Sequence, residues 1–390
     1  MIGQENFSSD IDEETLTKEF LSLAKKFSAP NEKSFTILAP SISADAHDFR
    51  SRLFIYNSQN NHTRKMFLPL RHAHFAVFHP TNTALAIVVE FRWNRACLVN
   101  WKEETILKTF EATGGHVFGG HAFFSADGLR LFMSEYPAND TTTGKIVIRN
   151  LSAGCVVEWL DTFAMQPHEF FLDTKEEKII VGHYGRGPYT SPIDRDGGVT
   201  VIDIKTKKLL FKFSPSQKNI NLCHIDRISD NRVFASSRDW IKGENYPQKL
   251  TEPLLPWEAI ALERAYSSPV YIASLTNGEL QEFMPPKLKE KMLYNFSTKT
   301  NAVSKTAVVA HLLGNAISFW NTENGMLLKR VGLPFSAVGV ALTPNKSHFI
   351  VQTGDGAFTF WNTSTLEFSG SRASALITQP SPHIDVIENE

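Results

Sequence analysis

The chain has 390 residues, of which 42% are hydrophobic and 21% are charged, a composition typical of a globular protein. Its formal net charge of −1 lacks the basic balance of a nucleic-acid-binding protein, and no apolar run approaches the roughly 18 residues of a membrane helix. The three cysteines are odd in number and form no CxxC pair, which argues against a disulfide framework. We therefore expect a globular protein with no nucleic-acid partner and no membrane span.

The N-terminal residues predict a helical extension over residues 1–34. Leu16, Phe20, Leu23 and Phe27 recur at helical spacing within residues 10–27, so one amphipathic helix is expected there. This helix either packs on the body or docks on a protein partner. The opening MIGQENFSSDIDEE has neither the basic nor the apolar region of a secretory signal. The chain as written is thus expected to be cytoplasmic, and periplasmic if an export signal has been removed.

From residue 35 onward the sequence has the texture of an all-β protein. Segments such as GVTVIDIKTKK, AISFWNTENGM and AFTFWNTSTLE alternate apolar and polar residues and then reach a polar turn. Units of this kind, repeated every 40 to 50 residues or so, are typical of a β-propeller. We predict a seven-bladed propeller over residues 35–372, with blades near 35–67, 70–110, 116–160, 165–214, 219–287, 290–332 and 334–371.

Two segments depart from the repeat. The fifth blade contains a long excursion from Ser236 to Ser268, which carries Trp240 and Trp257 and is expected to pack over one face of the propeller. The polar tail, residues 373–390, is either loose or completes the first blade and closes the ring.

Four histidines return at a nearly constant interval: His74, His121, His168 and His224 are separated by 47, 47 and 56 residues. A residue that recurs once per blade occupies equivalent positions around the propeller axis. The comparable turn follows His74 one or two residues later than it follows the others, and a one-residue slip moves a side chain to the opposite face of a strand. His74 therefore belongs to the set only if a bulge, or His72 in its place, restores the register.

Several segments resemble a bacterial family of propeller-like proteins catalogued as a domain of unknown function. They are GGHVFGGHAFFSADGLRLFMSEY, QPHEFFLD, RHAHFAVFHP, INLCHID and VGVALTPNKSHFIVQTGDG, and their order and spacing match across about residues 65 to 360. The resemblance implies a propeller without an established activity, often exported and often encoded beside imelysin-type and other iron-uptake components. The chain departs from the family in lacking a visible export signal and in having Ser191 where the family usually has a histidine.

The recurring histidines predict a site at the mouth of the central channel. Neutral imidazole is a common ligand of transition metals, so His121, His168 and His224 are candidate ligands of iron, copper or zinc, with His74 provisional. His116 lies five residues before His121 and is a further candidate ligand. Glu169 and Glu135 are candidates for carboxylates that orient a ring nitrogen.

Three functions are compatible with this pattern. The first is binding of a transition metal or small ligand by the histidines. The second is a protein-interaction scaffold that uses the N-terminal helix and the excursion over 236–268. The third, ranked last, is a hydrolase or lyase that uses the histidines and Glu169 as acid and base. A structural role also explains the periodicity, because propeller repeats often use a histidine to hydrogen-bond the backbone between blades.

Overall fold

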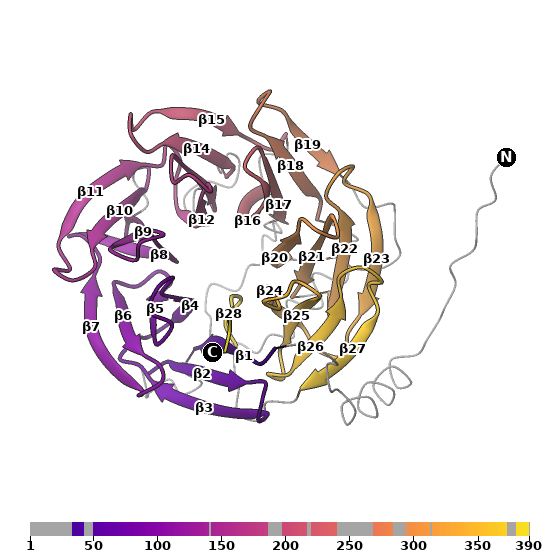
Figure 1. Ribbon diagram of the computed structural model, residues 1–390. Coiled ribbons are helices and arrows are strands. Elements are labelled where there is room, and N and C mark those ends of the chain that lie inside the picture. Colours follow the sequence, from indigo (N-terminus) through magenta and orange to yellow (C-terminus); the bar gives the residue numbers. More distant parts are fainter. Residues whose placement is uncertain are drawn as a thin grey trace, which may run out of the picture.

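The structure is a computed structural model that describes residues 33–42, 50–139, 142–185, 197–216, 220–239, 268–283, 292, 295–312, 314–372 and 380–389. Seven four-stranded antiparallel sheets are arranged as blades around one axis (Figure 1). This confirms the seven-bladed all-β propeller, and the described residues contain no helix. The helix predicted within residues 10–27, Ser191 and most of the 236–268 excursion lie outside the described residues.

The strands follow the chain around the ring. Blade 1 contains β1 (Phe35–Ser41), β2 (Arg52–Asn57), β3 (His62–Phe67) and β28 (Asp385–Glu388); blade 2 contains β4 (Ala73–Phe78), β5 (Leu85–Glu90), β6 (Arg95–Asn100) and β7 (Thr105–Glu111). Blade 3 contains β8 (His116–Phe124), β9 (Arg130–Pro137), β10 (Lys145–Asn150) and β11 (Val156–Asp161); blade 4 contains β12 (Pro167–Leu172), β13 (Lys178–His183), β14 (Val199–Asp203) and β15 (Leu209–Phe213). Blade 5 contains β16 (Ile220–Ser229), β17 (Arg232–Asp239), β18 (Val270–Ser274) and β19 (Leu280–Phe283). Blade 6 contains β20 (Asn295–Asn301), β21 (Thr306–His311), β22 (Ala316–Asn321) and β23 (Leu327–Gly332); blade 7 contains β24 (Ala337–Leu342), β25 (His348–Thr353), β26 (Phe358–Asn362) and β27 (Phe368–Arg372).

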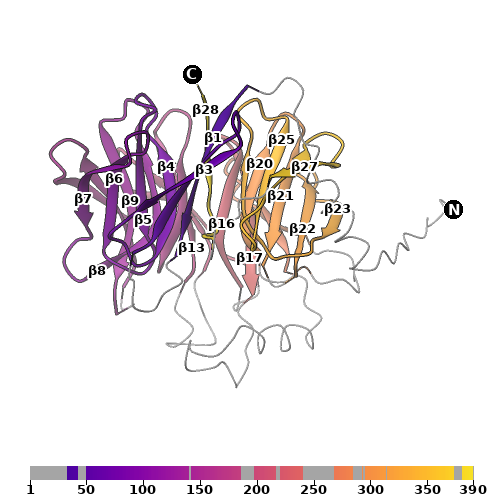
Figure 2. The ribbon, with the colours of Figure 1, turned by 90° about the horizontal axis from the view of Figure 1, so that it is seen from below.

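The last strand closes the ring. β28 pairs antiparallel with β1, from Phe35↔Glu388 to Leu38↔Asp385, and takes the innermost position of blade 1 (Figures 1 and 2). Of the two alternatives for the tail, residues 380–389 thus complete the first blade. Because this pairing joins the two ends of the ring, the segment before β28 is carried to the propeller axis.

The core lies between neighbouring blades, where apolar faces of adjacent sheets pack together. Leu53 and Ile55 of blade 1 belong to the same buried cluster as Ala76 and Val88 of blade 2. The alternation of apolar and polar residues read from the sequence supplies these faces, since successive side chains of a strand point to opposite sides. The outermost strands are much more exposed, as in β7, where Phe110 is the one buried residue.

The innermost strands of blades 2 to 7 each contain an irregularity near their beginning. Pairing with the next strand shifts register in all six strands, at Ala73/Phe75, Phe118/Ala122, Pro167/Phe170, Asn221/His224, Asn295/Ser297 and Ala337/Gly339. A β-bulge inserts a residue and re-aims the side chains beside it. The shift next to His74 is the bulge that the sequence required for this histidine to join the others.

Candidate metal centre on the propeller axis

Five histidines from five consecutive blades gather on the axis. His74, His121, His168 and His224 lie on the innermost strands β4, β8, β12 and β16, and His383 precedes the innermost strand of blade 1 by two residues. All five side chains are buried, none being more than 4% exposed. In blades 6 and 7 the residues at the bulge are apolar instead, Phe296 and Val338.

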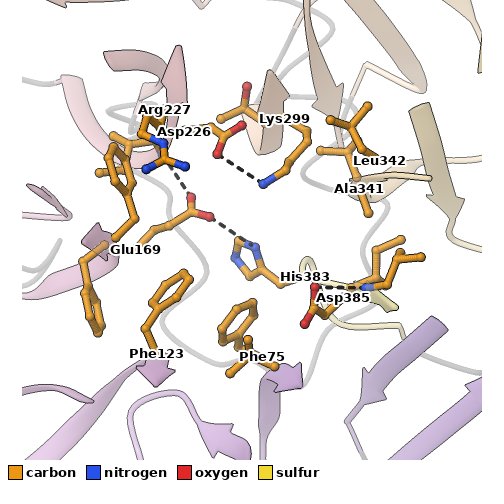
Figure 3. A pocket seen from close by; sticks show the side chains of 18 of the residues that line it. Phe75, Phe123, Glu169, Asp226, Arg227, Lys299, Ala341, Leu342, His383 and Asp385 are labelled. Atoms are coloured by element: carbon orange, nitrogen blue, oxygen red, sulfur yellow. Dashed lines mark hydrogen bonds and ion pairs between the residues drawn. The ribbon is translucent and has the colours of Figure 1, made fainter. Parts of the chain in front are cut away.

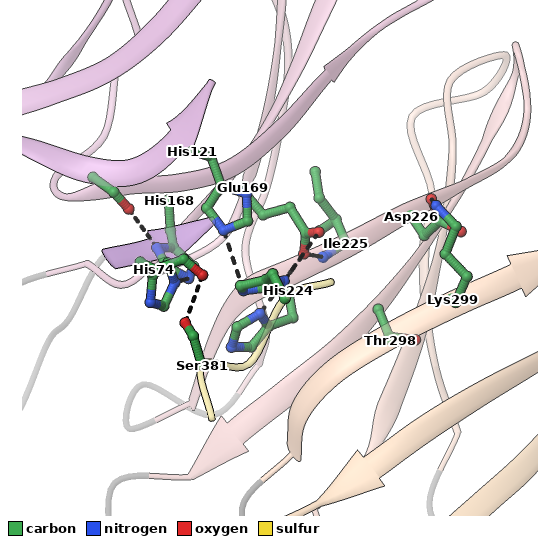
Figure 4. Close-up of polar contacts among 12 residues, drawn as sticks. His74, His121, His168, Glu169, His224, Ile225, Asp226, Thr298, Lys299 and Ser381 are labelled. Atoms are coloured by element: carbon green, nitrogen blue, oxygen red, sulfur yellow. Dashed lines mark hydrogen bonds and ion pairs between the residues drawn. The ribbon is translucent and has the colours of Figure 1, made fainter. Parts of the chain in front are cut away.

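Four of these histidines have donor nitrogens close enough to share one metal ion. The candidate ligand atoms of His74, His121, His168 and His383 all lie within 4.8 Å of one another. Nε2 of His74 is 3.4 Å from Nε2 of His168 (Figure 4). Nε2 of His121 is 3.2 Å from Nε2 of His383. Zinc–nitrogen bonds of 2.0–2.1 Å in a tetrahedral site place the nitrogens about 3.3 Å apart. The two measured separations match that value.

A backbone contact sets the tautomer of His168. Its Nδ1 lies 2.5 Å from the carbonyl oxygen of Gly119, which can only accept a hydrogen bond. Nδ1 therefore carries the proton, and in the neutral ring the Nε2 lone pair points toward the other histidines. Ligating histidines commonly donate their second nitrogen to a carbonyl in this way.

The glycines before His121 allow this close packing. Gly120 has φ of +99°, and a Cβ atom there would lie 2.6 Å from Cδ2 of His74. A Cβ atom on Gly119 would lie 2.0 Å from the carbonyl oxygen of Pro167. Side chains at either position would collide with neighbouring blades, so the GGH sequence is required by the approach of three blades to one point.

The surroundings keep the imidazoles neutral. Burial lowers the pKa of His74, His121 and His168 well below the usual value, and the neighbouring histidines lower each of them further. Phe91 packs on His74 and His168 with ring centroids 4.9 and 5.1 Å away. Neutral imidazoles in an apolar shell retain the lone pairs that a metal ion needs.

Glu169 lies beside the four-histidine group, near the rings of His224 and His383. Its Oε2 accepts a hydrogen bond of 2.9 Å from the backbone N–H of Ile225 and lies 3.7 Å from Nδ1 of His224. Its Oε1 is 4.0 Å from Nδ1 of His383. Burial, and next the charge of Asp226, raise the pKa of Glu169 to about 8. Glu169, His224 and His383 thus form a second group with metal-ligand spacing, joined to the first through His383.

Two candidate residues lie apart from these groups. The imidazole of His116 is partly exposed, with Nδ1 3.1 Å from the carbonyl oxygen of Gly114. Glu135 is buried, but Arg149 donates to its Oε1 at 2.9 Å while Thr113 donates to its Oε2 through the backbone and the hydroxyl. In place of the orientation of a ring nitrogen predicted for it, Glu135 holds Arg149 and the chain before β8.

His383 is the residue that sequence reasoning missed. It is 215 residues or more from His74, His121 and His168 in the chain, and the expected series of histidines ended at His224. One signal was present, because the tripeptide His-Ile-Asp at 224–226 recurs at 383–385. Ser381 anchors this segment: its hydroxyl donates to the carbonyl oxygen of His74 at 2.5 Å, and its N–H donates to that of Pro40 at 3.0 Å.

Other buried histidines have a structural role, because their rings are within hydrogen-bond distance of protein oxygen atoms. Nε2 of His79 lies 3.1 Å from the carbonyl oxygen of Gly128 and so links blades 2 and 3. His183 lies with Nε2 2.9 Å from the hydroxyl of Thr200. His311 lies with Nε2 2.8 Å from the hydroxyl of Ser318, to which Trp320 also donates. Structural histidines therefore exist in this propeller, away from its axis.

Sequence comparison finds a protein-family model that matches part of the chain. Residues 67–245 match a family model described as "Protein of unknown function (DUF1513)". The match spans blade 2 to the middle of blade 5 and includes the histidines at 74, 121, 168 and 224, and it supports the resemblance to a family of unknown function. No curated protein sequence matches the chain.

Comparison with solved structures concerns the fold alone. Kuenenia stuttgartiensis hydrazine synthase is similar with a TM-score of 0.57 and 10% sequence identity, covering 87% of this chain and 89% of that one. At this identity the likeness shows a shared propeller architecture and carries no statement about activity. Among the described residues, no helix is long and apolar enough to cross a lipid bilayer.

Proposed function

We propose that the protein binds one transition-metal ion on the propeller axis through His74, His121, His168 and His383. The observation that carries this proposal is the convergence of four ligand atoms within 4.8 Å from four different blades. An all-imidazole set suits iron, copper and zinc and disfavours magnesium and calcium, which take oxygen ligands. The Nε2–Nε2 separations of 3.4 Å between His74 and His168 and of 3.2 Å between His121 and His383 fit a four-coordinate site.

The residues around the ligands would complete the site. The carbonyl oxygen of Gly119 holds the His168 ring in the tautomer that presents Nε2. Glu169 stands where its carboxylate can orient His224 and His383. When bound, such an ion polarises an oxygen ligand or exchanges an electron with one, depending on the metal.

Metal titration of the full-length protein tests this proposal. Chelator-treated protein is titrated with Zn²⁺, Cu²⁺ and, without oxygen, Fe²⁺, and bound metal is measured by mass spectrometry after gel filtration. We expect close to one ion per chain in the wild type. The double variant His121→Ala/His168→Ala should retain almost none, while circular dichroism remains that of a β-protein.

A matched control removes two imidazoles from outside the site. His62 is exposed and His116 is partly exposed, so His62→Ala/His116→Ala should bind metal like the wild type. The proposal fails if the wild type takes up no more metal than the double variant at positions 121 and 168, or if the control loses metal equally.

The other two functions stay predictions. The scaffold function depends on the N-terminal helix and on the excursion over 236–268, most of which lies outside the described residues. The hydrolase or lyase function depends on a substrate for Glu169 and the nearby histidines. A pull-down with and without residues 1–30 tests the first of these, since loss of a stable partner on deletion is its expected outcome.

A further inference from the structure

A cavity of about 570 Å³ lies along the propeller axis next to the histidines (Figure 3). Its lining includes Phe75 and Val77, which follow His74 on β4, so it lies further along the innermost strands than the four-histidine group. Glu169 and His383 form part of its wall and also belong to the histidine groups. Its volume is within the range of about 300–1,000 Å³ that is usual for small-molecule sites.

The cavity has an aromatic side and a carboxylate side. Phe75 and Phe123 lie next to each other on blades 2 and 3, with ring centroids 5.8 Å apart (Figure 3). The carboxylates among the described lining residues outnumber the cationic side chains by five to three; they are Glu169, Asp173, Glu176, Asp226 and Asp385, against Arg227, Lys299 and Lys346. A cavity of this composition favours a ligand that is cationic and partly apolar.

Most of the charged groups in the wall are already engaged. Asp226 lies 3.2 Å from Nζ of Lys299 and also accepts hydrogen bonds from the backbone N–H and hydroxyl of Thr300. Asp385 accepts hydrogen bonds from the backbone of Phe78 and Val386. Lys299, Asp226 and Asp385 therefore already have partners within the protein.

Glu169 differs from these acids. Oε2 accepts one backbone hydrogen bond, whereas Oε1 has no hydrogen-bond partner among the described residues and is 4.0 Å from the nearest imidazole nitrogen. The side chain is 16% exposed, and that exposure is toward the cavity it lines. A hydrogen-bond donor of a ligand in the cavity can reach this oxygen.

We propose that the cavity binds a small organic amine, with its protonated nitrogen at Glu169 and its apolar body against Phe75 and Phe123. An ammonium group supplies the donor that Glu169 lacks and adds the charge that the excess of carboxylates favours. The aromatic faces accommodate both a hydrocarbon body and a nearby cation. This inference goes beyond the proposed metal site, because the cavity contacts require no ion.

The test uses three probes of similar shape and different charge. Calorimetry at pH 9, where Glu169 with its pKa of about 8 is ionised and a primary amine is still largely protonated, compares 2-phenylethylamine, 2-phenylethanol and 3-phenylpropanoate. The full-length protein is first treated with chelator, so that an amine cannot bind by coordinating a metal. We expect the amine to bind about tenfold more tightly than the alcohol, and the carboxylate not to bind measurably.

Two variants locate the binding. Glu169→Gln should weaken amine binding about tenfold and leave alcohol binding unchanged, because it removes the charge and keeps the shape. Phe123→Leu should weaken the amine and the alcohol alike. Glu103→Gln, a change of the same kind at an exposed residue outside the cavity, is the control and should bind the amine as the wild type does.

Three results would overturn the proposal: no binding of the amine, equal binding of all three probes, or an amine affinity unaffected by Glu169→Gln. Zinc uptake is measured on the same preparations. A protein that takes up zinc and ignores the amine refutes the cavity proposal alone, and one that binds the amine without taking up metal refutes the metal proposal alone.

Discussion

Two regions of this propeller contain fully buried histidines, and they differ in what the ring nitrogens face. Within blades 4 and 6, His183 and His311 are hydrogen-bonded to the hydroxyls of Thr200 and Ser318. On the axis, His121 faces His383 and His74 faces His168 across 3.2 and 3.4 Å. Nδ1 of His74 and of His121 have no hydrogen-bond partner among the described residues. Burial and residue type are the same in both regions, so only the contacts separate a structural histidine from a candidate ligand.

The most direct test of this comparison measures both zinc affinity and stability in variants of His383 and His311. His383→Ala should weaken zinc binding by at least about 100-fold, since it removes one of four ligands, while the blades stay folded. His311→Ala should leave zinc affinity unchanged and lower the free energy of unfolding by roughly 2–4 kcal/mol, because it leaves a void and removes a hydrogen-bond partner of the buried Ser318 hydroxyl. Calorimetric titration and urea unfolding measure the two quantities. Equal effects of both substitutions on zinc binding would remove the distinction between the regions.

Metal removal should act most strongly on the ring closure. His383 belongs to the last strand segment, which joins blade 1 by four residue pairs, so a shared ion would tie the two ends of the ring. Zinc at 100 times its Kd should raise the free energy of unfolding by about 2.7 kcal/mol. Hydrogen exchange should show the largest loss of protection in residues 380–389 when zinc is removed. Uniform protection changes over all blades would contradict a local tie at the closure.

The structural histidines should make stability depend on pH. Burial lowers the pKa of His311 to about 3, whereas in the unfolded chain it is near 6.5. Its neutral form therefore stabilises the fold above pH 6.5, and this contribution is lost as the pH falls through 6.5 toward 3. Between pH 7 and pH 5, metal-free wild type should lose about 2 kcal/mol more stability than His311→Gln. Parallel pH profiles for the two proteins would show that His311 titrates normally.

A further effect of similar size concerns the glycine that faces His74. Gly120→Ala places a methyl group against the His74 ring in a backbone with φ of +99°, and should cost about 1–3 kcal/mol of stability and weaken zinc binding. Gly115→Ala is the matched control, because φ there is +76° and nothing lies within 4 Å of the added carbon. The control should lose about 1 kcal/mol and bind zinc normally. Equal zinc affinity in the two variants would show that the Gly120 contact does not position His74.

Sequence reasoning predicted the blades, and its repeating histidines include three members of the four-histidine group, His74 among them only provisionally. His224, predicted as a ligand, lies in the second group with Glu169 and His383 instead. Apolar alternation with regular turns marked seven blades, since each blade is formed from a contiguous stretch of chain apart from the closing strand. The stride of histidines followed for the same reason: His74, His121 and His168 occupy equivalent strands of consecutive blades. Glu169 was identified as a candidate because it directly follows His168, one of the regularly spaced histidines.

Other features of the site required the folded molecule. The β-bulge at Ala73/Phe75 lets the side chain of His74 point to the axis. Arg149 of β10 pairs with Glu135 of β9, and His116 lies outside the group with Nδ1 near the carbonyl oxygen of Gly114. The positions of His74 and Glu135 depend on contacts between strands, which residue spacing alone does not contain.

The sequence by itself determined a seven-bladed ring with histidines repeating around its axis, because each blade of a β-propeller corresponds to one repeat in the sequence. Only the tertiary structure decided which histidines meet. Closure pairs β28 with β1 and brings His383 beside His121, 262 residues away along the chain. That contact arises when the two ends of the ring join, so it has no counterpart in local periodicity.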